Sequence, residues 1–103
     1  MKARVPQEIK DEFIKIVKGI DLDQTFDSHF VIESFFRSGK KKNADLYLKY
    51  CFDDIALWHS ELSKVVAELE GDLVERVGEK HVSFTLIGTA SPNMLWRKTK
   101  PKE

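Results

Sequence analysis

The chain has 103 residues, of which 42% are hydrophobic and 11% aromatic, so it can build one real core and does not have the composition of a disordered segment. Basic and acidic residues each number 17, so the formal net charge is zero and the global positive charge typical of nucleic-acid-binding proteins is absent. No stretch approaches the ~20 apolar residues of a membrane span, which excludes a membrane partner of that kind.

The single cysteine, Cys51, rules out an intrachain disulfide and predicts a reducing, cytoplasmic compartment. The length suits one domain, which we expect over residues 1–98, followed by a flexible tail over residues 99–103. The initial methionine leads us to expect a complete short chain.

The first third of the chain predicts two helices with a very short strand between them. An apolar stripe at helical spacing follows Pro6 and predicts a helix over residues 6–18. Thr25 and Phe26 are expected to form the short strand. Ser28 is then the expected N-cap of a second, heavily buried helix that ends at Gly39.

The middle of the chain begins with a change in composition. Residues 38–43, SGKKKN, predict an exposed loop that carries Lys40, Lys41 and Lys42. Residues 44–52 fit either a helix or a strand, and we favour the helix. Residues 53–69 predict a long amphipathic helix, because Asp53 or Asp54 can cap it and a continuous apolar stripe follows: Ile55, Trp58, Leu62, Val65, Val66 and Leu69.

The last third predicts antiparallel strands. Residues 73–77, LVERV, are expected to form a strand, with Gly78 in the turn. HVSFTLI alternates apolar and polar residues and predicts a second strand. GTASPN is the expected loop and MLWRK the last short strand. We expect Trp58 and Trp96 in the core, and Cys51 as a buried structural residue.

The order of helices followed by a C-terminal hairpin, with SELSKVVAELEGDLVERVGEK and then NMLWRKT, resembles a winged helix-turn-helix domain. The resemblance implies a small α+β fold with three to four helices and a two- to three-stranded antiparallel wing. It implies double-stranded DNA as the partner, bound by a small transcriptional regulator or accessory factor.

Under this resemblance the helix over residues 54–69 corresponds to the family's recognition helix. Residues that its apolar stripe leaves facing outward would contact the groove of DNA: His59, Ser60, Ser63 and Lys64. Lys80, Arg97 and Lys98 would hold the DNA backbone from the wing, with Lys100 beside them. The lysines of the KKK run would add phosphate contacts.

The charge of this same region favours a different partner. Residues 53–79 contain eight acidic and only two basic residues, a net charge of −6, which would repel DNA phosphates. The alternative is therefore a winged-helix protein–protein interaction module without nucleic-acid binding, which uses the acidic helix face or the edge of the wing.

Motifs for catalysis or for a cofactor are not found in the sequence. Asp21, Asp23 and Asp27 resemble part of a calcium loop, but Phe26 stands at the required glycine and Ile32 at the required glutamate. The remaining candidate ligands lack metal-binding spacing: Cys51, His29, His59 and His81. We therefore expect no metal, no cofactor and no enzymatic activity, and a small enzyme of unknown chemistry is kept as the third alternative.

Overall fold

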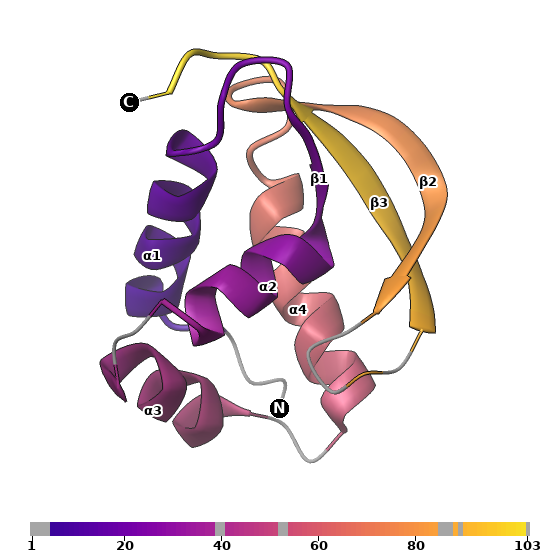
Figure 1. The fold of residues 1–103 in the computed structure, drawn as a ribbon. Coiled ribbons are helices and arrows are strands. Elements are labelled where there is room, and N and C mark those ends of the chain that lie inside the picture. Colours follow the sequence, from indigo (N-terminus) through magenta and orange to yellow (C-terminus); the bar gives the residue numbers. More distant parts are fainter. Residues whose placement is uncertain (1–4, 39–40, 52–53, 85–87, 89, 103) are drawn as a thin grey trace.

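The computed structural model describes residues 5–38, 41–51, 54–84, 88 and 90–102, apart from the side chains of residues 79, 80 and 91. Within them, helices precede a C-terminal β-hairpin (Figure 1). The elements are α1 (Gln7–Lys18), β1 (Thr25–Asp27), α2 (Ser28–Phe36), α3 (Lys41–Tyr50), α4 (Ile55–Ala67), β2 (Val74–Phe84) and β3 (Ala90–Lys98). The fold is α+β with a winged-helix-like layout, as the sequence predicts.

The core lies where α1, α2 and α4 meet under the sheet. The apolar stripe of α1 is buried, and the Phe13 ring packs on that of Phe35 with a centroid distance of 5.3 Å. Trp58 is fully buried on α4, and Trp96 of β3 is buried against the same core, so both tryptophans occupy the predicted place. Cys51 is only partly buried and packs on the edge of this core.

Helix starts follow the expected chemistry with one correction. Asp27, and not Ser28, caps α2: its carboxylate accepts a hydrogen bond from the Phe30 amide at 2.8 Å. Asp54 caps α4 in the same way through the Leu57 amide, at 3.1 Å. The expected end of the second helix at Gly39 lies outside the described residues, and α2 itself ends at Phe36.

The lysine-rich stretch is partly helical, which corrects the predicted loop. Lys41 and Lys42 lie in the first turn of α3, while Lys40 lies outside the described residues. The helix forms here because Asn43 and Tyr47 enter the core on one face. Asn43 donates its amide to the Phe35 carbonyl oxygen at 3.3 Å, which ties α3 to α2. The helix favoured for residues 44–52 is confirmed over most of its length.

The three strands form an antiparallel sheet in the order β1-β3-β2 within the described residues. Gly78 does not turn the chain, as predicted, but lies inside β2. Two irregularities, between Arg76 and Gly78 and between Gly78 and His81, place extra residues in β2 opposite a regular β3. The two strands predicted on either side of Gly78 are thus one long strand. Its partner β3 begins at Ala90, before the predicted MLWRK strand.

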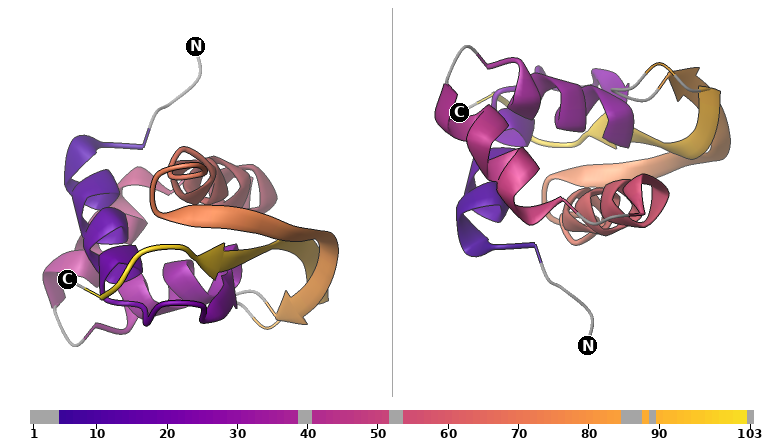
Figure 2. Two further views of the ribbon diagram at one scale, coloured as in Figure 1. Left: turned by 90° about the horizontal axis from the view of Figure 1, so that it is seen from above. Right: turned by 90° about the horizontal axis from the view of Figure 1, so that it is seen from below.

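The long hairpin reaches sideways beyond the helices (Figure 2). Its end near the core is joined to β1, where Phe26 pairs with Trp96. Beyond the chain's last strand, the Thr99 amide still donates to the Leu73 carbonyl oxygen at 2.9 Å. No helix in the described part of the chain has both the length and the apolar character needed to cross a membrane.

Candidate functional site: a groove between α4 and the hairpin

A groove of about 490 Å³ lies between α4 and the β2–β3 hairpin. We call it the α4–hairpin groove. One wall consists of small side chains on α4: Ala56, Ser60, Ser63 and Ala67. The opposite wall comes from β3, with Pro92, Met94 and Trp96, and α2 contributes Ser28 and His29. Small residues on the helix leave the space that larger ones would fill, so the groove follows directly from the sequence of α4.

The apolar wall of the groove continues outward along the hairpin. Val82 pairs with Pro92, and Phe84 pairs with Ala90. Paired residues lie on the same face of a sheet, and alternate residues along regular β3 share that face with Met94. Val82 is 61% exposed and Phe84 72% exposed. The sheet face on the α4 side therefore presents two large apolar side chains that the protein's own core leaves uncovered.

Among the described residues, the charged side chains that line the groove are both basic. Lys64 comes from α4 and Arg76 from β2, and the guanidinium of Arg76 lies 6.0 Å from the centre of the Trp96 ring. Lys64 forms an ion pair with Glu61 at 2.6 Å, and Arg76 forms one with Glu70 at 3.1 Å. Neither carboxylate is itself among the described lining residues.

Two buried histidines, His29 and His59, also line the groove. The burial of His59 corrects the prediction that this side chain faces outward. His59 does not face outward but is buried, and its Nε2 lies 2.6 Å from the Tyr47 hydroxyl. Burial raises the pKa of Tyr47 to about 12, so the phenol keeps its proton and can donate it to His59. Burial lowers the pKa of His59, and neighbouring His29 lowers it further.

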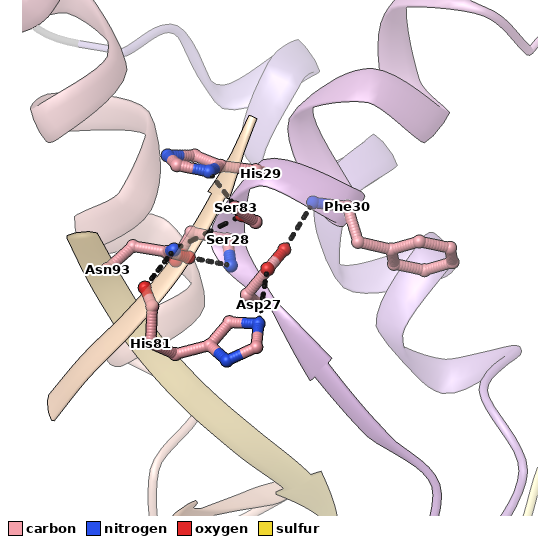
Figure 3. Close-up of polar contacts among 7 residues, drawn as sticks. All are labelled: Asp27, Ser28, His29, Phe30, His81, Ser83 and Asn93. Atoms are coloured by element: carbon pink, nitrogen blue, oxygen red, sulfur yellow. Dashed lines mark hydrogen bonds and ion pairs between the residues drawn. The ribbon is translucent and has the colours of Figure 1, made fainter. Parts of the chain in front are cut away.

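His29 belongs to a polar network that fastens the hairpin to the start of α2 (Figure 3). Burial lowers the pKa of His29, against the opposing effect of Asp27, and its Nδ1 lies 2.6 Å from the Ser83 hydroxyl. Asn93 is the centre of the network. Its side-chain oxygen accepts from the Ser28 amide at 3.0 Å, and its nitrogen donates to the His81 carbonyl oxygen at 3.0 Å.

Within the described residues, the same network does not join a serine, a histidine and a carboxylate in series. The serine–histidine pair is Ser83 with His29, but the nearby carboxylate, Asp27, accepts from the Phe30 amide and lies 3.2 Å from His81 instead. No group of three or more metal-ligating side chains is found among the described residues. The contacts of this arrangement hold the hairpin against the start of α2.

Lys98 is the second correction to the predicted site. Its side chain is fully buried, and its ammonium donates to the carbonyl oxygens of Lys18 and Ile20 at 3.1 and 2.7 Å. These oxygens lie at and just beyond the C-terminal end of α1, where backbone carbonyls lack helical partners and carry partial negative charge. The expectation that Lys98 faces a phosphate is therefore wrong, because the residue fastens β3 to α1.

The other predicted basic residues do not share one surface. Arg97 alternates with Trp96 and Lys98, so it lies on the outer face of the sheet, where it pairs with Glu75. Lys41 and Lys42 lie on α3, on the side of the molecule away from the hairpin (Figures 1 and 2). The side chain of Lys80 and the whole of Lys40 lie outside the described residues.

Only part of the predicted site thus lies together. Four predicted residues line the groove together, namely buried His59 with Ser60, Ser63 and Lys64, and the structure adds Arg76 and His29 to them. The predicted DNA contacts of these residues stay predictions. Arg76 was not singled out from the sequence, although it alternates with Val74 in the LVERV strand.

The fold and the groove together define a small α+β domain of winged-helix-like layout with an open groove beside α4. No protein-family model, curated protein or solved structure matches the chain. The function proposed below therefore rests on the site alone.

Proposed function

We propose that the chain is a protein-interaction module that binds a short segment of another protein in the α4–hairpin groove. The observation that carries this proposal is the uncovered apolar wall formed by Val82 and Phe84 beside a groove of about 490 Å³. Large apolar side chains gathered on an exposed surface mark interaction sites, and a concave site with few polar groups suits a partner's side chains.

The distribution of charge supports a protein partner over a long polyanion. Around α4 and the sheet, basic side chains are already paired with carboxylates: Lys64 with Glu61, Arg76 with Glu70, Arg97 with Glu75, and Lys100 with Asp72. DNA binding depends on cations that neutralise many phosphates along an extended path. These carboxylates would compete for the same cations and repel the phosphates.

Double-stranded DNA is the second candidate partner, with the chain as a small transcriptional regulator. It is favoured by the position of α4 directly before the hairpin and by the exposed Ser60 and Lys64 on that helix. In this alternative α4 enters the major groove, and Ser63 and the wing residue Lys80 add contacts.

The proposal is for binding and not for catalysis, and it places the protein in the cytoplasm. The single cysteine supports a reducing compartment. Partly buried Cys51 packs against the core.

The test is a selection of a random peptide library on the immobilised chain, together with a titration of a mixed-sequence DNA duplex at low salt. We expect enriched peptides that bind the wild type and lose binding to Ser60→Trp, whose indole would fill the groove from an exposed position on α4. Leu48→Trp, at an exposed position of α3, is the matched control and should bind normally.

The two candidate functions predict opposite results. Duplex affinity that falls steeply with salt, with no peptide enriched, would overturn the proposal in favour of DNA binding. Peptides that bind both tryptophan variants equally would also overturn it, because the partner would then lie outside the groove.

A further inference from the structure

Among the described residues that line the α4–hairpin groove the charge has one sign, although the surrounding segment is acidic. Its charged lining residues are Lys64 and Arg76, and its titratable ones are His29 and His59. Lys64 and Arg76 carry positive charge, and the two histidines are either neutral or positively charged. We propose that the segment bound in the groove is an acidic one, in which at least one carboxylate is placed between apolar residues. This inference rests on the proposed function and names the chemistry of its partner.

The two basic side chains are placed to receive a carboxylate from opposite sides. Lys64 lies on the helix wall and Arg76 on the strand that faces it, and their side chains are 60% and 47% exposed. Glu61 and Glu70, which pair with them, are not among the described lining residues of the groove. A guanidinium has five N–H donors and an ammonium three, so each cation can bind a further carboxylate beside its present one.

The apolar surface beside the two cations determines which residues the partner segment carries next to its carboxylate. Trp96 and Met94 form the wall directly beside Arg76, and Val82 and Phe84 extend it outward. A segment that places its carboxylate between Lys64 and Arg76 can lay apolar residues on this wall. A purely acidic segment would leave the wall exposed to water and would gain only the charge interaction.

The acidic residues outside the groove limit how much negative charge the partner carries. Glu61, Glu68 and Glu70 lie on α4 or directly after it, and Glu75 pairs with Arg97 on the outer face of the sheet. A run of phosphates or carboxylates would extend over these side chains and be repelled. One or two carboxylates held within the groove would not.

The experiment uses the tightest peptide from the library selection and two variants of it, in which each carboxylate is replaced by its amide or by lysine. Calorimetry then measures their affinity for the wild type, Lys64→Ala and Arg76→Gln. Lys41→Ala and Arg37→Ala serve as controls, because both remove an exposed basic residue from a helical ion pair away from the groove. Circular dichroism melts check that every variant is folded.

We expect the amide peptide to lose about tenfold in affinity, as the loss of a charge-assisted hydrogen bond predicts, and the lysine peptide to lose more. Lys64→Ala and Arg76→Gln should each weaken the acidic peptide about tenfold, leave the amide peptide nearly unchanged, and differ in this from both controls. Selected peptides without carboxylates, or an amide peptide that binds as tightly as its parent, would overturn the inference and leave the proposed function standing. A selection that enriches no peptide would overturn the proposed function, and the inference with it.

Discussion

The two ends of the β2–β3 hairpin are held in different ways. At the end near the core, Val74, Trp96 and Lys98 are buried under the helices. At the far end, Val82 and Phe84 are exposed, and the strands are fastened to α2 mainly by polar contacts such as those of Asn93. One pair of strands thus combines a half that belongs to the core and a half that leaves its apolar face uncovered.

The two ends of the hairpin therefore serve different purposes: the near half stabilises the fold, and the far half offers a surface for binding. Apolar side chains in the near half contribute their burial to folding, whereas Val82 and Phe84 in the far half stay mostly exposed. We therefore expect substitutions in the near half to change the free energy of unfolding, and substitutions in the far half to change binding.

The largest difference should lie between two aromatic residues on the same face of the hairpin. Trp96→Ala removes a buried side chain and should cost about 3–5 kcal/mol of unfolding free energy. Phe84→Ala removes an exposed one and should change it by no more than about 0.5 kcal/mol. Urea denaturation of both variants measures the two effects. Equal losses would show that the far half is also part of the core.

Lys98 gives the next largest effect. Lys98→Met keeps most of the apolar stem but leaves the carbonyl oxygens of Lys18 and Ile20 without their donor, which should cost about 1–3 kcal/mol. Lys100→Ala removes an exposed lysine from an ion pair with Asp72 and should cost less than about 1 kcal/mol. A Lys98→Met variant more stable than wild type would mean that burial of the ammonium costs more than its hydrogen bonds return.

Asn93→Ala should loosen the far half of the hairpin with little effect on the near half. It removes the acceptor of the Ser28 amide and the donor to the His81 carbonyl oxygen, and we expect a loss of about 1 kcal/mol. Hydrogen exchange should become faster in residues 81–84 and stay slow in residues 74–76. Faster exchange at both ends would show that the hairpin opens as one unit.

Acidification should weaken the fold through the histidines at the groove. Their pKa values are lowered in the folded protein, so the unfolded chain binds protons more readily than the folded one. Their contribution is intact above the ordinary pKa of 6.5 and is lost as the pH falls through the folded values. Thermal melts across this range should show a smaller acid-induced decrease for His29→Gln and His59→Gln. If both variants lost as much thermal stability on acidification as the wild type, the loss would come from other titratable groups.

Much of the fold could be predicted from the sequence because its helices carry strong apolar stripes. The spacing of apolar residues predicted the positions of α1 and α4 in the chain. Asp54, which caps α4, is one of the two residues expected as its cap. The hairpin was predicted with the wrong turn, since glycine within a strand can mark a bulge as well as a turn. Gly78 lies in β2 between two irregularities, and the sequence alone does not distinguish these cases.

The site was predicted less well because burial depends on neighbours that are distant in the sequence. His59 lies four residues after Ile55 and three before Leu62, so its place beside the apolar stripe was visible from the spacing. Lys98 lies two residues after Trp96 and therefore on the same strand face. That a lysine can be buried there depends on the end of α1, whose position only the folded structure gives.

The central claim is that a partner segment binds against the inner face of the far half of the hairpin. The most direct measurement is nuclear Overhauser contacts between the selected peptide and a methyl-labelled sample of the chain. We predict contacts from the peptide to the methyl groups of Val82 and Met94, which lie on the sheet face toward α4. Contacts confined to Leu95, on the outer face of the sheet, or to Leu48, on exposed α3, would contradict it.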